Sequence, residues 1–204
     1  LRYQDWWLNK IYKKTVKKNK NKINILVATR CWDHKFSKES FKFIIISIMK
    51  LCYEYKNIKI TFKIHPAEYE KNYLLKLLDN YDKNCWQIKT DHIINESKKC
   101  DIAISMNTTA CLDIVMTKKP CIEFWLNKVD SLNVIRQNNT YKTNFQKLGI
   151  VKNINNYNKL SKEIKFLRNA KKYNEMVKKQ HNNFLKLNNL KKVNVNKILA
   201  KIIK

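Results

Sequence analysis

Short β-branched runs alternate with helical patterns along most of the chain, and this alternation restricts the fold more than any other feature. Apolar runs of buried-strand type lie at residues 23–29, 58–64, 85–89, 101–105 and 121–125. A shorter sixth candidate begins at Val151. Strands that alternate with helices form βαβ units, whose strands are parallel. We therefore predict an α/β fold: a doubly wound parallel sheet of five to six strands, followed by C-terminal helices.

The chain of 204 residues is long enough for one large domain preceded by a short basic segment. In residues 1–22, apolar side chains such as Trp7 and Val16 lie at roughly helical spacing before a run of lysines, so we expect a basic linker helix there. Residues 23–204 are expected to form the βα domain. Because the sequence does not begin with Met, we also expect a partner domain before Leu1.

Lysine dominates a strongly basic composition. Lys and Arg together number 43 against 16 Asp and Glu, which gives a formal net charge of +27, but only four of the 43 are arginines. Proteins that bind nucleic acids specifically usually depend on Arg for bidentate contacts. Lys, Asn and Ile all have codons made only of A and T, so an AT-rich genome accounts for the excess. We expect no specific nucleic-acid partner.

Six cysteines are scattered through the chain, mostly in apolar stretches, and no two lie at the CxxC spacing of a metal knuckle. Cysteine in such surroundings is a small buried hydrophobic residue. The sequence therefore favours neither a metal site nor a disulfide framework, and it fits a reducing, cytoplasmic location. The longest apolar run, residues 43–49, is too short to cross a bilayer.

Ligands of doubly wound sheets bind beyond the carboxyl ends of the strands, so the loops that follow the strands hold the candidate site residues. Lys63, His65 and Pro66 follow the second strand. Pro66 lacks an N–H group and fixes the start of the next helix, which places His65 at a rigid corner. An imidazole there is suited to donate a hydrogen bond to a phosphate oxygen. The alternative is a histidine that only caps the turn.

A second group of polar side chains, SMNTTACLD, follows the fourth strand. Ser105 ends that strand, and Asn107, Thr108 and Thr109 place side-chain donors beside the free N–H groups of a helix start, an arrangement that binds anions. Asp113 lies further along the same helix and is suited to accept hydrogen bonds from ribose hydroxyls. The alternatives are simple N-capping of the helix and a solvated Asp113.

Arg30 and His92 complete the candidate set. Arg30 follows the first strand, where a guanidinium is a good clamp for phosphate, and it shares its loop with Asp33 and His34. His92 follows the third strand, where we expect a contact to a base or a ribose. For Arg30 the alternative is a surface loop of mixed charge.

Common motifs for nucleotides and metals are absent from the sequence. The single glycine, Gly149, excludes both the GxxxxGK and the GxGxxG loop. The sequence also has no HExxH motif, no paired Asp-x-Asp and no Cys–His metal spacing. We therefore expect no metal and no cofactor, with phosphates neutralised by helix N-termini, His, and Arg or Lys.

The segment KIHPAE and, roughly 40 residues later, the segment DIAISMNTTACLDIVMTKKPCIEF resemble the C-terminal domain of GT-B-type bacterial glycosyltransferases. The similar group includes polysialyltransferases, Kdo transferases and CDP-glycerol glycerophosphotransferases of capsules and other surface polysaccharides. Its His-Pro motif matches His65 and Pro66, and its Ser/Thr-rich motif matches Ser105 and residues 107–109. The resemblance implies that these residues bind the donor phosphates. The chain departs from the family by Asn-Thr-Thr in place of paired serines and by Asp113 where Glu is frequent.

The resemblance implies the Rossmann-like, nucleotide-sugar-binding half of a GT-B fold over residues 23–204. It implies a metal-independent transferase whose donor is a nucleotide-activated sugar or glycerophosphate, linked preferentially to CMP or CDP. The acceptor would be an oligosaccharide or lipid-linked surface polysaccharide, with the enzyme peripheral at the inner membrane. The catalytic base is expected in an N-terminal domain outside this chain, so the isolated chain is expected to be an inactive fragment.

Two other functions fit parts of the pattern. One is a sugar-nucleotide enzyme similar to UDP-N-acetylglucosamine 2-epimerase, which shares the fold but carries Gly-rich and acidic signatures that this chain lacks near Ser105. The other is a non-catalytic module that docks on anionic lipid or nucleic acid through the lysines of residues 10–22.

Overall fold

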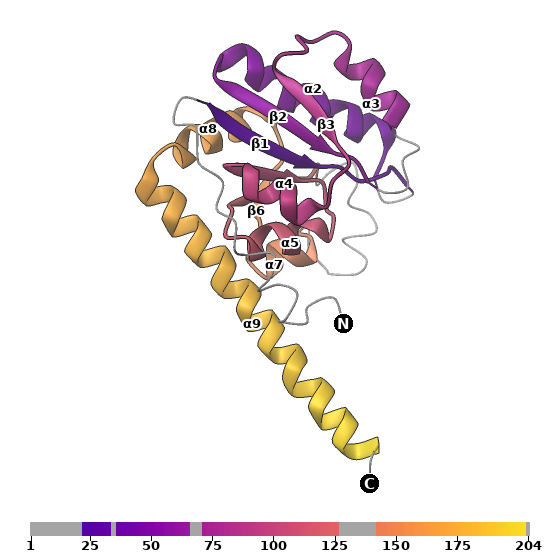
Figure 1. Cartoon of the computed structure of the whole chain (residues 1–204), viewed down its shortest axis with the longest axis vertical. Helices are drawn as coiled ribbons and strands as arrows, with labels where there is room; N and C mark the ends of the chain where they lie inside the picture. Colours follow the sequence, from indigo (N-terminus) through magenta and orange to yellow (C-terminus); the bar gives the residue numbers. More distant parts are fainter. Residues whose placement is uncertain (1–21, 34–35, 66–70, 127–141, 203–204) are drawn as a thin grey trace.

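The computed structural model describes residues 22–33, 36–65, 71–126 and 142–202, with side chains described as far as Leu187 (Figure 1). The predicted linker helix lies outside these residues except for Lys22. No described helix is long and apolar enough to cross a membrane.

The six strands form one sheet in which all neighbours are parallel. In chain order they are β1 (Ile23–Ala28), β2 (Ile58–Lys63), β3 (Trp86–Lys89), β4 (Ile102–Ser105), β5 (Cys121–Phe124) and β6 (Lys152–Ile154). Their order across the sheet is β3-β2-β1-β4-β5-β6. Both the strand assignments and the doubly wound arrangement are therefore confirmed. The order reverses between β1 and β4, and the carboxyl ends of these two strands border the crevice where such folds bind ligands.

Helices connect the strands and follow the last one. They are α2 (Lys38–Glu54), α3 (Lys71–Leu78), α4 (Ile93–Lys99), α5 (Ala110–Met116), α7 (Asn144–Lys147), α8 (Tyr157–Leu167) and α9 (Ala170–Ile202). The N-cap of α2 is Ser37, whose side chain accepts a hydrogen bond of 3.1 Å from the N–H group of Ser40. This bond satisfies one of the donors that a helix start leaves free.

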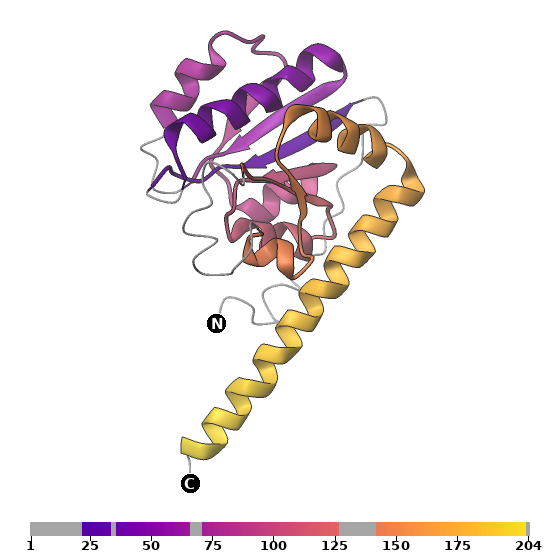
Figure 2. The ribbon, with the colours of Figure 1, turned by 180° about the vertical axis from the view of Figure 1, so that it is seen from behind.

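Helices cover both faces of the sheet (Figures 1 and 2). An apolar cluster lies between the sheet and the helices on each face. Along β1, Ile25 and Val27 belong to the cluster with α2, α3 and α8, while Leu26 and Ala28 belong to the cluster with α4, α5 and α9. All four side chains are buried, as the alternation of a strand between two helical layers requires. Burial of each large aliphatic side chain contributes about 1.5–3 kcal/mol, so this sandwich fixes the sheet that carries the loops of the site.

The helix α9 is held to the body through residues 180–183 and then projects away from it (Figure 1). The side-chain amide of Gln180 bonds both the N–H group (2.9 Å) and the carbonyl oxygen (2.7 Å) of Cys121 in β5. Asn183 donates to the carbonyl oxygen of Gly149 at 3.1 Å. Gly149 has a φ of +65°, and a Cβ at that position would lie 2.6 Å from Asn183 Nδ2. Glycine is therefore favoured where α9 meets the domain, because another residue would be strained at this φ and would displace the Asn183 side chain.

Candidate functional site

A cavity of about 410 Å³ opens at the carboxyl edge of the sheet. Its wall is formed by the ends of β1 and β2 and by the loops that follow β2, β3 and β4. Six of the predicted site residues line it: Lys63, His65, His92, Thr108, Thr109 and Asp113. The volume lies in the range of small-molecule sites, and the polar groups converge from separate elements, which is typical of a ligand site.

His65 is fixed at the corner after β2 by hydrogen bonds to the end of β1. Its N–H group donates to Thr29 Oγ1 at 3.2 Å, and the Thr29 hydroxyl donates to the carbonyl oxygen of Lys63 at 3.3 Å. The Nδ1 atom of His65 lies 3.4 Å from Cys31 Sγ. The backbone of His65 is thus held by the loop after β1, and His65 lines the same cavity as Thr108. Residues on opposite sides of the sheet could not share a ligand, but His65 and Thr108 line one cavity. Pro66 lies outside the described residues.

The start of α5 forms another part of the wall. Thr108 Oγ1 accepts a hydrogen bond of 3.4 Å from the N–H group of Ala110, so Thr108 caps the helix while also facing the cavity. Thr109 is the N-cap residue by position but makes no side-chain capping bond. Asp113 follows in the first turn, is 9% exposed and also lines the cavity, so it is not the solvated residue that the alternative predicts.

His92 caps α4 beside the cavity. Its Nδ1 atom accepts a hydrogen bond of 3.3 Å from the N–H group of Ile94. In the neutral ring the proton therefore lies on Nε2, which makes that atom the donor. Asp91 accepts bonds at Oδ1 from Asn95 Nδ2 (3.0 Å) and the His92 N–H group (2.6 Å). These two bonds, that from the Asn95 side chain first, lower the pKa of the Asp91 carboxyl.

Three predicted residues lie outside this cavity wall. Arg30 does not point into the cavity but ties two loops together, because its Nη1 atom donates to the carbonyl oxygen of Asn107 at 3.2 Å and its Nη2 atom pairs with Asp33 at 2.6 Å. Asn107 has a φ of +49°, in the left-handed region that Asn tolerates. Ser105 is fully buried, and its hydroxyl lies 3.5 Å from the carbonyl oxygen of Ile122.

Glu123 is a buried acidic residue that the sequence reasoning missed. Its Oε2 atom accepts hydrogen bonds from Thr143 Oγ1 at 2.6 Å and from Gln146 Nε2, whereas its Oε1 atom has no hydrogen-bond partner in the described part of the chain. Burial raises the pKa of Glu123 to about 7, against the opposing effect of these two bonds and of Arg30. An acidic residue inside the apolar strand CIEFW was the signal in the sequence, since a carboxylate is rarely buried without partners.

Among the described residues, no group of three or more His, Cys, Asp or Glu side chains is placed to hold a metal ion. The absence of a metal from the predicted reaction stays a prediction. The cavity wall instead offers one ammonium group, two imidazoles, four hydroxyls and two carboxylates. Such a set suits a ligand that carries phosphate at one end and hydroxyls at the other.

No protein-family model matches the sequence, and no curated protein is similar to it. Solved structures do share the fold. The chain is 16% identical to the wall teichoic acid polymerase TagF, with a TM-score of 0.57 over 89% of this chain and 43% of TagF. It is 12% identical to the C-terminal domain of the Francisella tularensis group 1 glycosyl transferase LpcC, with a TM-score of 0.52 over 80% of this chain and 85% of that domain.

A third similar structure is UDP-GlcNAc 2-epimerase from Neisseria meningitidis, at 14% identity and a TM-score of 0.55, over 96% of this chain and 48% of the epimerase. The chain has the fold of one GT-B domain. Likeness at these identities establishes the fold alone, so it confirms the predicted Rossmann-like architecture. The chain spans less than half of TagF and of the epimerase.

Proposed function

We propose that this chain is the donor-binding domain of a glycosyltransferase that transfers a sugar or glycerophosphate from a nucleotide-activated donor, by preference linked to CMP or CDP. The acceptor is a surface polysaccharide, as an oligosaccharide or on a lipid carrier. One observation carries the proposal. Six polar side chains chosen from sequence for donor binding line one cavity at the point where the strand order reverses.

The cavity wall supports binding of a nucleotide by its phosphates. Lys63, His65 and His92 place one cation and two imidazole rings around the same space, and Thr108 and Thr109 add hydroxyl donors. Charge-assisted hydrogen bonds of this kind strengthen as the bond to the leaving phosphate breaks, which stabilises the departing nucleotide. Asp113 is the acceptor for ribose hydroxyls. The general base that activates the acceptor comes from a domain outside this chain.

Ligands of the structural neighbours agree with this assignment. TagF has been solved after a soak with CDPG, and the epimerase is bound to UDP-GlcNAc. Both are nucleotide-linked, and we assign a ligand of this class to the cavity. We further propose that the transferase works without a metal, in the cytoplasm at the inner membrane surface, where lipid-linked acceptors are available.

Isothermal titration with CMP, CDP and UDP tests the proposal. We expect CDP to bind and the substitution His65→Ala to weaken it by about tenfold or more, because a hydrogen bond to a charged group is worth about 1.5–3 kcal/mol. His181→Ala is the matched control, since that histidine lies on α9 and bonds the carbonyl oxygen of Val115. Absence of binding by all three nucleotides at millimolar concentration would overturn the proposal.

The epimerase reaction is the second candidate, because an epimerase shares the fold over 96% of this chain. Incubation of the full-length enzyme with a UDP-sugar, with and without an acceptor, separates the two. A changed sugar without acceptor indicates epimerisation, and release of nucleotide only with acceptor indicates transfer.

A further inference from the structure

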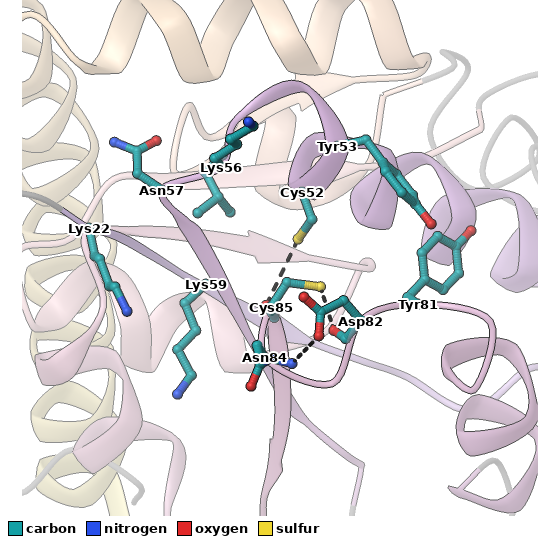
Figure 3. Close-up of a pocket in the computed structure, with 11 residues that line it drawn as sticks. Lys22, Cys52, Tyr53, Lys56, Asn57, Lys59, Tyr81, Asp82, Asn84 and Cys85 are labelled. Carbon is teal, nitrogen blue, oxygen red and sulfur yellow. Dashed lines mark hydrogen bonds between the residues drawn. The ribbon is translucent and has the colours of Figure 1, made fainter.

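A second cavity lies at the opposite, amino edge of the sheet, away from the proposed donor site. It measures about 350 Å³ and is bounded by the end of α2, the turn into β2 and the loop before β3. Figure 3 shows its lining side chains. Three lysines (Lys22, Lys56 and Lys59) and two tyrosines (Tyr53 and Tyr81) contribute to the wall. None of these residues belongs to the cavity at the carboxyl edge.

The lysines of this cavity have no acidic partner among the residues that the structure describes. Within the described part of the chain, no carboxylate forms an ion pair with Lys22, Lys56 or Lys59. Asp82 also lines the cavity, but its Oδ1 atom accepts a hydrogen bond of 2.9 Å from the N–H group of Asn84. The ammonium ends of Lys22 and Lys59 extend in the same direction in Figure 3. Three lysines against the single carboxylate of Asp82 leave the wall with a net positive charge, which favours an anion.

The aromatic wall adds a second requirement to the ligand. The rings of Tyr53 and Tyr81 have centroids 5.9 Å apart and planes inclined at 51°, so they do not form a parallel slot for a flat base. Their apolar faces suit a sugar ring, and their hydroxyls suit its polar groups. Burial, and then the neighbouring Tyr53, raise the pKa of Tyr81, so its phenol stays a hydrogen-bond donor. The side chains of Asn57 and Asn84 supply further donors and acceptors at the same cavity.

Lysines are frequent over the whole chain and carry no argument alone. What distinguishes this place is that three lysines, two tilted tyrosines and two asparagines line one space of monosaccharide to disaccharide size. We infer that the amino-edge cavity is a binding site for an anionic sugar, either a sugar phosphate or a uronic acid residue of a polysaccharide. This inference goes beyond the proposed donor site and does not depend on it.

Binding of defined sugars, followed by NMR on the tyrosine ring protons and by calorimetry, tests the inference. We expect glucose 6-phosphate and glucuronate both to shift the ring signals of Tyr53 and Tyr81. Neutral glucose and inorganic phosphate should bind about tenfold more weakly, because each lacks one half of the ligand. The relative affinity of the two anionic sugars then identifies phosphate or carboxylate as the preferred anion.

Matched variants locate the binding. The substitution Lys59→Gln should lower the affinity for glucose 6-phosphate by about fivefold. The double variant Lys22→Gln/Lys59→Gln should lower it further. Lys89→Gln is the control, since this exposed lysine ends the neighbouring strand β3 at the carboxyl edge. Titration of CDP in each variant reports the other cavity separately, so failure of the nucleotide proposal and failure of this one are distinguishable.

Three results would overturn the inference. Inorganic phosphate that binds as tightly as glucose 6-phosphate would show a bare anion site without a sugar component. AMP that shifts Tyr53 and Tyr81 at lower concentration than the sugars would show a nucleotide site. Unchanged affinity for glucose 6-phosphate in the folded Lys22→Gln/Lys59→Gln variant would remove the site from this cavity altogether.

Discussion

The two edges of the sheet carry cavities of similar volume, about 410 and about 350 Å³, that are built in different ways. At the carboxyl edge, hydrogen bonds fix the wall: the His65 backbone bonds Thr29, the His92 side chain bonds the start of α4, and Arg30 outside the wall holds the loop of Asn107. At the amino edge, the lysines have long, flexible side chains and form no ion pair with any described residue.

This difference separates a preorganised site from an electrostatic one. Groups fixed before binding lose little conformational entropy when a ligand arrives, so they support tight and selective recognition. Mobile charges attract an anion over a distance but gain less from each contact. We expect substitutions at the carboxyl edge to change folding stability as well as binding, and substitutions at the amino edge to change binding alone.

The largest effect is expected for Glu123→Gln, measured as the free energy of unfolding between about pH 4 and about pH 8. The pKa of this carboxyl is near 7 in the folded protein and near 4.5 in an ordinary environment. The folded state therefore binds the proton more tightly, and stability from this group is present below about pH 4.5 and lost as the pH rises to about 7. The variant should gain up to about 3 kcal/mol over the parent protein at alkaline pH.

The pH profile distinguishes this explanation from a simple packing effect. The gain of Glu123→Gln should vanish at the acid end of the range, because the parent carboxyl is then protonated in both states. Glu175→Gln, at an exposed position on α9, should leave the profile unchanged. Parallel curves for the parent and Glu123→Gln would contradict the raised pKa.

Arg30→Ala should cost about 2 kcal/mol of folding stability, because it leaves the carbonyl oxygen of Asn107 without its charged donor. Loss of this tie also frees the loop that carries Thr108, so CDP affinity should fall together with stability. Arg30→Lys keeps the charge but not the fork of donors, and an intermediate effect is expected. Chemical denaturation and calorimetry measure both quantities. The affinity for glucose 6-phosphate at the amino edge should not change. A lower affinity there would show that the two cavities are not independent.

Thr108→Val removes one hydroxyl with little change in volume. The substitution should cost about 1 kcal/mol of stability, since the hydroxyl caps α5. It should also lower the affinity for CDP severalfold. Thr108→Ser retains the hydroxyl and should restore both quantities. If Thr108→Val lowers stability but leaves CDP affinity unaltered, the residue is a cap and not a ligand contact.

The smallest expected effect is the response to salt. Raising NaCl from about 0.05 M to about 0.5 M should lower the affinity for glucose 6-phosphate at the amino edge by a few fold, because salt screens the lysines of that cavity. The affinity for CDP at the carboxyl edge should fall less, since half-buried groups and neutral hydrogen bonds also contribute to binding there. Calorimetry at both salt concentrations measures the ratio, and greater salt sensitivity at the carboxyl edge would reverse the comparison.

Much of the fold follows from local patterns in the sequence. Each predicted apolar run is a strand, because β-branched residues bounded by polar loops have few other stable arrangements in a chain with βα alternation. The rule that ligands bind beyond strand ends then selected the loops that carry His65, His92 and Thr108. The rule locates loops but not side-chain directions, which is why Arg30 and Ser105 were placed in the cavity and are not there.

Features that depend on contacts between distant segments could not be predicted. Glu123 meets Thr143 and Gln146 only after β5 and α7 are packed together, and the rise in its pKa comes from that packing. The amino-edge cavity likewise combines Lys22, the end of α2 and the loop before β3. No local spacing in the sequence links these segments.

The bond pair between Gln180 and Cys121 joins residues 59 positions apart in the sequence. A ribosome makes this chain from its N-terminus, so β5 leaves the exit tunnel well before the amide that satisfies its first residue. The first residue of β5 is therefore satisfied only by a segment made 59 residues later, and a nascent chain stopped before Gln180 would leave the N–H group and the carbonyl oxygen of Cys121 without that partner.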